Sequence, residues 1–129
     1  MSTDIRAAQG AVANFMRAAG QLSDGLSAGT RRERRVELIW EELDELKEAF
    51  VDGDRVEMAD AIADLIYTTL GAAVEEGINA EVAFEEASAS NDTKIDWEND
   101  RPWATHPNGK VSKDYHFVEP NMRRAVLKS

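Results

Sequence analysis

Two neighbouring segments of this sequence, residues 30–50 and 54–77, repeat apolar side chains at intervals of three and four residues. That interval places the apolar side chains on one face of an α-helix. In the first segment this seam consists of Val36, Ile39, Leu43, Leu46 and Phe50. Only the short stretch VDGD separates the two segments. A connection this short predicts two helices packed antiparallel to each other.

Local signals mark where these and two further helices begin and end. Thr30 followed by Glu33 forms a capping-box pattern, which predicts that the 30–50 helix starts at Thr30. Gly77 ends the 54–77 helix, and Asn79 caps a fourth helix that runs to about Ala89. A first helix is expected from about Asp4 to Ala19, where Gly20 stops it. Its inner face is formed by Ile5, Ala8, Val12, Phe15, Met16 and Ala19.

The last forty residues lose the helical period and contain all three prolines. We therefore predict an all-α fold, an antiparallel helical bundle of four main helices followed by an irregular C-terminal tail. The length of 129 residues fits one domain, residues 1–129. The 54–77 helix is apolar on most of its circumference, more than three other helices can cover. We expect a second copy to complete the core in a homodimer or a homotetramer.

Composition excludes several classes of function. The net charge of −10 argues against binding of nucleic acid polymers, which requires clustered Lys and Arg. No apolar run approaches the roughly 20 residues of a membrane span, and the N-terminal residues show no secretion signal. A cytoplasmic location is the expectation that follows. The absence of cysteine removes disulfides and thiolate metal ligands.

Acidic side chains lie beside the apolar faces of the two central helices. Glu42 and Glu45 are three residues apart and therefore share a helix face. On the second helix a stripe within roughly 80° of the helical wheel contains Glu57, Asp60, Asp64, Tyr67 and Gly71. Carboxylates drawn towards the core must be protonated, paired or bound to a cation. Eleven acids between Glu37 and Asp64 face only two basic residues, which favours a hard divalent cation held by oxygen ligands.

A structural interpretation competes with the metal site. Acid-rich helix faces are commonly just solvated, and Glu57 fits a capping box with Asp54 as well as it fits a ligand role. Glu42, Glu45 and Asp64 favour the site because their angular positions border the apolar face.

Three motifs occur in order along the chain. The first is EExxE, formed by Glu41, Glu42 and Glu45. The second is DxLxDLxYxxxG, with isoleucine at the place of the first leucine, formed by Asp60, Ile62, Asp64, Leu65, Tyr67 and Gly71. The third is NxxK followed by GKxxK, formed by Asn91, Lys94, Gly109, Lys110 and Lys113, with Phe117 and Pro120 beyond. Together they resemble the all-α nucleoside triphosphate pyrophosphohydrolases, the superfamily of MazG, dimeric dUTPases and phosphoribosyl-ATP pyrophosphohydrolase. The resemblance runs from about Arg31 to Pro120 and is greatest to compact MazG-like or phosphoribosyl-ATP pyrophosphohydrolase-like proteins.

The resemblance implies hydrolysis of a nucleoside triphosphate to a monophosphate and pyrophosphate, with Mg²⁺ as cofactor and Mn²⁺ as a substitute. The ligands it implies are Glu42, Glu45, Asp64 and Asp60. Glu41 or Glu45 would orient the attacking water as a general base. The substrate would be bound by Asn91, Lys94, Lys110, Lys113 and Tyr67, although Tyr67 fits a core role equally well.

One departure from the superfamily pattern affects the metal site. The second motif of the superfamily is generally ExxD, and with its Asp at Asp64 the Glu falls on Ala61. We expect Asp60 to supply the missing carboxylate from the adjacent turn, with Glu57 as the weaker candidate.

Three functions stay open at this point. The favoured one is cleansing of the nucleotide pool, with dUTP or another nucleoside triphosphate as substrate. The second is phosphoribosyl-ATP hydrolysis, ranked lower because the resemblance to compact MazG-like proteins continues through the tail. The third is a non-catalytic nucleotide-binding or interaction module of the same fold, which the loss of the carboxylate at Ala61 keeps in consideration.

Overall fold

The computed structural model of the protein describes residues 3–127. It confirms the all-α class, with four α-helices and a single two-stranded sheet of two-residue strands in the described part of the chain. The chain divides into two compact units, of which the first ends at Ala80 and the second begins at Glu81. No helix among the described residues is both long enough and apolar enough to cross a membrane.

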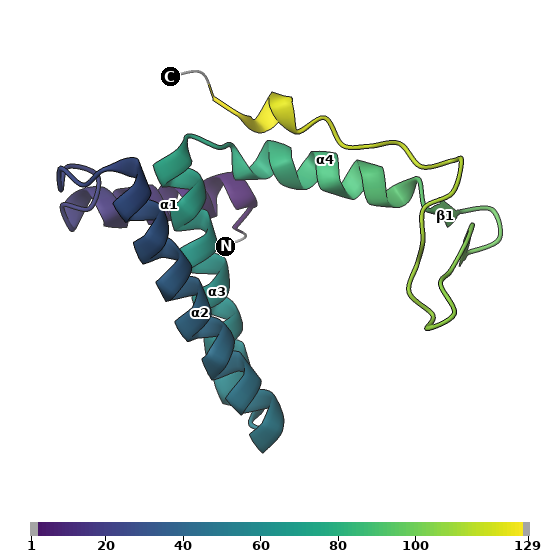
Figure 1. Ribbon diagram of the computed structural model, residues 1–129, viewed down its shortest axis with the longest axis horizontal. Coiled ribbons are helices and arrows are strands. Elements are labelled where there is room, and N and C mark those ends of the chain that lie inside the picture. Colours follow the sequence, from purple (N-terminus) through teal and green to yellow (C-terminus); the bar gives the residue numbers. More distant parts are fainter. Residues whose placement is uncertain (1–2, 128–129) are drawn as a thin grey trace. The chain divides into compact units, whose positions relative to one another are not determined.

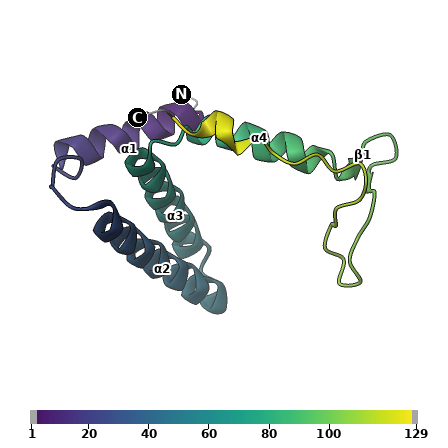
Figure 2. The ribbon, with the colours of Figure 1, turned by 45° about the horizontal axis from the view of Figure 1, so that its top comes forward.

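The first unit contains α1 (Ile5–Ala18), α2 (Ala28–Asp52) and α3 (Arg55–Glu76). Figures 1 and 2 show α2 and α3 side by side, with α1 crossing α3 near its C-terminal end. The tight reversal between α2 and α3 uses Gly53, whose φ of 66° suits a residue without a Cβ. Asp54 then caps α3 by accepting hydrogen bonds from the backbone N–H groups of Val56 and Glu57. The predicted antiparallel hairpin is therefore confirmed.

The core of this unit lies where α1 meets α3. Val12 and Met16 of α1 are each 2 % exposed and pack with Leu70 of α3. The residues packed around them are Ile5, Ala8, Val74 and Ala80. Gln9 ties α1 to the end of α3, because its amide donates to Ile78 O at 2.7 Å and accepts from Ala80 N at 2.9 Å. These contacts fix α1 across the hairpin.

The predicted start of α2 at Thr30 is wrong. The helix begins at Ala28, and the N-cap is Ser27, whose Oγ accepts from Thr30 N at 3.1 Å. Ser27 also donates to Thr30 Oγ1 at 3.0 Å, which engages the hydroxyl that the capping box would need. Serine and threonine are both favourable N-cap residues. Ser27, three residues earlier in the sequence, is the one that caps the helix, so the helix starts before Thr30.

Replacing Ser27 with Ala should lower the free energy of unfolding by about 1 kcal/mol, because the N–H of Thr30 loses its acceptor. Glu33→Ala, which would remove the reciprocal side chain if Thr30 and Glu33 formed a capping box, should change it by less than about 0.5 kcal/mol. Urea unfolding of the two variants measures both values. A larger loss in the Glu33 variant would restore the original assignment of the cap.

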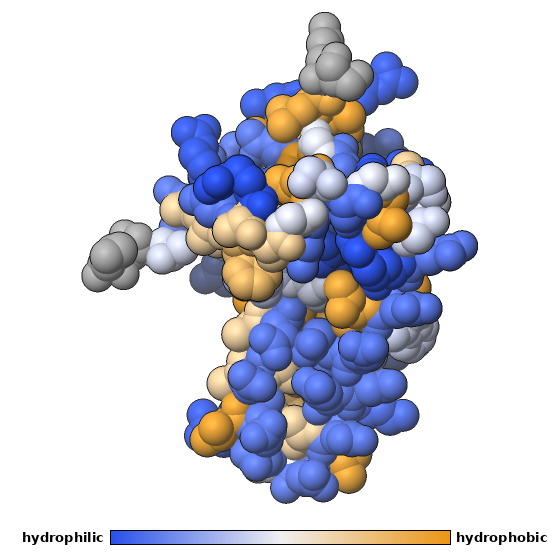
Figure 3. Space-filling model, turned by 90° about the vertical axis from the view of Figure 1, so that its left-hand side faces the viewer, coloured by the Kyte–Doolittle hydropathy of each residue, from blue (hydrophilic) through white to orange (hydrophobic). Residues whose placement is uncertain are grey.

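The apolar seam of α2 is only partly covered within one chain. Val36, Leu43 and Phe50 are 52 %, 43 % and 58 % exposed, and Ile62 and Ile66 of α3 are 45 % and 56 % exposed. Figure 3 shows the region around the α2–α3 turn as mostly hydrophilic, with hydrophobic side chains in separate patches. Oligomerisation, which would cover such side chains, stays a prediction.

The second unit contains α4 (Ala80–Asp92) beyond its first residue, together with β1 (Ile95–Asp96), β2 (Arg101–Pro102) and the 3₁₀ helix η1 (Met122–Ala125). The helix ends at Asp92 rather than near Ala89, so Asn91 lies in its last turn. The tail returns along α4 (Figure 1), where Ser90 Oγ donates to Val118 O at 2.6 Å. Glu86 accepts from Asn121 N at 2.7 Å and pairs with Arg124. Side-chain hydrogen bonds thus hold the irregular tail predicted from the sequence.

Candidate functional site

Three carboxylates converge between α2 and α3. Glu42 and Glu45 lie one helical turn apart on α2, and Asp64 lies on α3. Each offers a carboxylate oxygen, and these oxygens all lie within 4.8 Å of one another. The antiparallel hairpin produces this meeting, because it brings the middle of one helix beside the middle of the other. Three oxygen donors at this spacing suit a hard divalent cation such as Mg²⁺.

Glu42 is the most strongly perturbed member of the cluster. Its Oε2 atom is buried and has no hydrogen-bond partner among the described residues. Burial, followed by the nearby carboxylates of Asp64 and Glu45, raises the pKa of Glu42 to about 7. A carboxylate in this setting gains a great deal from a bound cation, which would supply the missing partner and offset the repulsion.

The raised pKa of Glu42 predicts a pH dependence of the metal-free protein. Between the ordinary pKa of 4.5 and the folded value of about 7, the folded state holds a proton that the unfolded state has released. The contribution of Glu42 to stability is therefore fully present below pH 4.5 and is lost as the pH rises through about 7. We expect the free energy of unfolding to fall by on the order of 2 kcal/mol from about pH 5 to pH 8 through this group.

Urea unfolding in the presence of a chelator, for wild type and Glu42→Gln, measures this effect. The difference between the two proteins removes the contributions of the other titrating groups. The stability of the variant relative to wild type should rise with pH. A difference that does not change between pH 5 and 8 would contradict the assignment.

The remaining acids proposed from the sequence do not join the three-carboxylate cluster. Glu41, Glu57 and Asp60 are exposed. Ala61 is 2 % exposed, so its methyl group is part of the helix packing. Glu57 donates its backbone N–H to Asp54, which supports the N-cap interpretation of this turn. The ligand role of Asp60 stays a prediction.

A cavity of about 440 Å³ opens beside Glu42 and Asp64. This volume lies in the range of small-molecule binding sites. Its walls come from α1, the α1–α2 connection, α2 and α3, and they combine apolar, aromatic and charged side chains. The lining residues are Val12, Phe15, Met16, Gln21, Arg34, Arg35, Leu38, Glu42, Asp64, Tyr67 and Thr68. Phe15 and Tyr67 meet edge to face, with ring centroids 5.9 Å apart.

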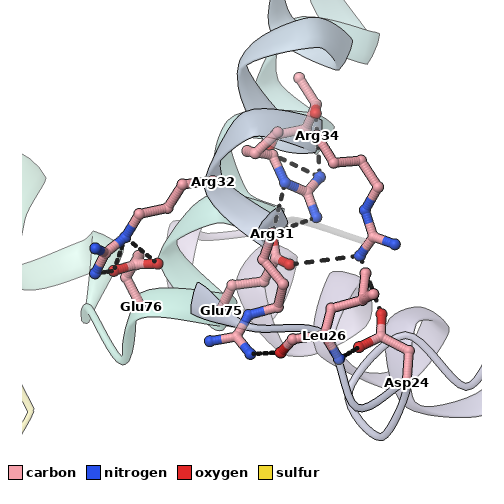
Figure 4. A network of polar contacts seen from close by, with 9 residues as sticks. Asp24, Leu26, Arg31, Arg32, Arg34, Glu75 and Glu76 are labelled. Atoms are coloured by element: carbon pink, nitrogen blue, oxygen red, sulfur yellow. Dashed lines mark hydrogen bonds and ion pairs between the residues drawn. The ribbon is translucent and has the colours of Figure 1, made fainter. Parts of the chain in front are cut away.

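Two arginines on the cavity wall belong to a polar network (Figure 4). Arg35 binds Glu75 with Nη2 and Oε1 2.6 Å apart, and its Nη1 donates to Thr68 Oγ1 at 3.2 Å. Arg34 donates to Asp24 at 3.1 Å, and its Nη2 lies 3.8 Å from Glu75 Oε2. The backbone N–H of Leu26 and the guanidinium of Arg34 lower the pKa of Asp24. The network thus ties the α1–α2 connection to α3.

The packing of Arg35 explains why position 71 is a glycine. A Cβ added at Gly71 would lie 2.7 Å from Nη1 of Arg35. The guanidinium therefore crosses α3 directly over the glycine, and a side chain there would displace it.

The basic residues of the third motif lie in the second unit. Lys94 Nζ donates to Asn91 Oδ1 at 2.9 Å and lies 5.7 Å from the centre of the Phe117 ring. Lys113 Nζ lies 4.5 Å from the same ring. Lys110 lies in a turn in which its carbonyl accepts from His106 N at 2.7 Å. The structure therefore places Lys94 and Lys113 at Phe117 and Asn91 beside Lys94. The role of all four residues in substrate binding stays a prediction.

Sequence reasoning missed the cavity residues from the N-terminal part of the chain. Phe15 was expected in the core, yet it is 55 % exposed at the cavity. Gln21, Arg34 and Arg35 were not expected to take part in the site. The available signal for the arginines was the basic run RRERR, which is separated by five residues from the first acidic motif.

A comparison with curated proteins finds no match. The family model of phosphoribosyl-ATP pyrophosphohydrolase matches residues 23–91, which is more than half of the chain. The matched segment includes all three clustered carboxylates and both arginines of the cavity wall. The family implies hydrolysis of a phosphoanhydride bond in a nucleotide-like substrate. The chain therefore belongs to the phosphoribosyl-ATP pyrophosphohydrolase family, within the MazG-like superfamily of nucleotide pyrophosphohydrolases.

Proposed function

We propose that this protein hydrolyses a nucleoside triphosphate, with Mg²⁺ as cofactor, to a monophosphate and pyrophosphate. One observation carries the proposal: three carboxylate oxygens lie within 4.8 Å of one another, and two of their residues, Glu42 and Asp64, line a cavity of about 440 Å³ whose wall also contains two arginines. Acidic ligands for a cation beside cationic side chains suit a substrate that brings several phosphates together with a metal ion.

The residues present fit Mg²⁺. Carboxylate oxygens are the ligands that this ion prefers, and the partnerless Oε2 of Glu42 offers one directly. Glu42, Glu45 and Asp64 would hold the ion, and Mn²⁺ would fit the same oxygen set. When bound, the ion would neutralise phosphate charge and make a water molecule more acidic.

The protein side chains would share the remaining tasks. Glu45, which is exposed at the cluster, or its neighbour Glu41 would accept a proton from the attacking water. Asn91, Lys94, Lys110 and Lys113 would bind phosphate and sugar oxygens. Tyr67 on the cavity wall would contact the nucleotide.

Two substrate classes have separate support. Free nucleoside triphosphates, including dUTP, follow from the resemblance of the motifs to MazG-like proteins. Phosphoribosyl-ATP is favoured by the family whose model matches residues 23–91. Both substrates carry a triphosphate group, so the same chemistry serves either one.

The test is an assay of the purified protein with Mg²⁺ and a panel of ribo- and deoxynucleoside triphosphates, dUTP and phosphoribosyl-ATP. Chromatography should separate release of monophosphate and pyrophosphate from release of diphosphate and phosphate. Pyrophosphate release supports the proposal, and the best substrate decides between the two classes. Release of phosphate, or no turnover of any substrate while Mg²⁺ still binds, would overturn it and favour the non-catalytic module.

We also propose that the protein is a homodimer or a homotetramer. Ile62 and Ile66 lie one turn apart on α3 and are both about half exposed, which suits an interface built from a second copy. Ile66→Glu should shift the mass in solution towards one chain, as measured by light scattering. The exposed Val51, 80 % accessible at the end of α2, provides a control as Val51→Glu. A wild-type protein with the mass of one chain would contradict the proposal.

A further inference from the structure

The cavity beside the carboxylate cluster is lined by two chemically different sets of side chains. Glu42 and Asp64 bring carboxylates to its wall, while Val12, Phe15 and Met16 of α1 bring apolar groups. The carboxylates suit an anionic group with its metal, and the apolar side chains suit a flat apolar group. The cavity thus suits a ligand that combines phosphate with an aromatic ring.

Two aromatic side chains of the cavity wall keep large exposed surfaces. Phe15 is 55 % exposed and Tyr67 is 42 % exposed, although their rings touch each other. Both residues line the cavity. A heteroaromatic base that packs on these rings would remove that surface from water.

Gln21 adds a polar group to the same wall. Its backbone N–H bonds to Met16 O at 2.8 Å, which fixes the residue just beyond the end of α1. Gln21 lines the cavity, and among the described residues no hydrogen bond of its side-chain amide is found. An amide offers both a donor and an acceptor, which is the combination that distinguishes the edge of one base from another.

We propose that Phe15, Gln21 and Tyr67 form the subsite for the nucleobase of the substrate, with Gln21 as a residue that determines base preference. The proposal rests on the nucleotide substrate proposed above and adds where its base binds. Phe15 and Gln21 precede the matched segment 23–91, so this subsite includes a part of the chain outside the family match.

The first test measures binding without turnover. Calorimetry with the deoxynucleoside monophosphates of all four bases gives dissociation constants for wild type and variants. Phe15→Ala should weaken binding about 10-fold. Phe84→Ala is the matched control, because Phe84 is 60 % exposed on α4 and does not line the cavity. Gln21→Leu should reduce the ratio between the best and worst base by about 10-fold.

Inorganic tripolyphosphate separates the base from the phosphates. Its affinity in the presence of Mg²⁺ should be the same for wild type, Phe15→Ala and Gln21→Leu, because it carries no base. Equal nucleotide affinities in wild type and Phe15→Ala would overturn the subsite, even if wild type releases pyrophosphate. Loss of affinity for tripolyphosphate as well would show a general structural defect and also overturn it. Base-dependent binding without pyrophosphate release would support the subsite and contradict only the proposed reaction.

Discussion

The variant Asp64→Ala should release pyrophosphate about 10²–10³ times more slowly than wild type. Asp64 is the only contribution of α3 to the three-carboxylate cluster among the described residues, so its loss leaves two ligands on α2 alone. The variant should also bind Mg²⁺ more weakly, because one of three charged oxygen donors is gone. A coupled assay of pyrophosphate and a Mg²⁺ titration measure the two effects separately.

The fold should survive this substitution. Removing one carboxylate relieves repulsion on Glu42, whose pKa is raised partly by Asp64, and should move that pKa back towards its ordinary value. Asp44→Asn removes a charge between Glu42 and Glu45 but outside the cluster, and it should retain activity. Undiminished activity in Asp64→Ala would contradict the assignment of the site.

The same assay decides the role of Asp60. The sequence predicts it as a fourth ligand, while the structure shows it exposed and outside the three-carboxylate cluster. If three carboxylates suffice, Asp60→Asn should retain most of the activity. A loss comparable to that of Asp64→Ala would establish Asp60 as the substitute for the glutamate missing at Ala61.

The helical hairpin and its carboxylates could be predicted because both depend on local spacing. Glu42 and Glu45 share a face by their separation of three residues, and the short turn leaves α3 no other position than beside α2. Glycine marked the end of α3 at Gly77, where the backbone has a positive φ. The start of α2 was missed because Ser27 and Thr30 compete as caps for the same turn, and sequence does not show which backbone N–H is closer.

The cavity could not be predicted, since it depends on how α1 crosses α3. Periodicity places Phe15 on the apolar face of its helix but does not show that the neighbouring wall is open there. The partners of Arg35 could not be predicted from the sequence for a similar reason. Glu75 lies 40 residues away in the sequence, and the long side chain reaches it only across Gly71 of the adjacent helix.

Arg35→Met should lower the free energy of unfolding by about 3–5 kcal/mol, the largest effect on stability expected in this protein. The side chains of Arg35 and Glu75 are only 13 % and 3 % exposed, so the substitution leaves Glu75 as a buried charge without its close partner. The more distant Arg34, at 3.8 Å, can compensate only in part. Urea unfolding at a fixed protein concentration measures the loss.

The neighbouring pair Arg32–Glu76 provides a matched control. It also joins α2 to α3, with Nη2 and Oε1 2.6 Å apart, but its side chains are 65 % and 29 % exposed. Arg32→Met should therefore cost only a small fraction of the loss in Arg35→Met, because water replaces the lost partner. In the double variant Arg35→Met with Glu75→Leu, no buried charge is left unpaired, so most of the loss should be recovered. A double variant as unstable as Arg35→Met would show that packing of the arginine over Gly71, rather than the charge of Glu75, is what stabilises the contact between the two helices.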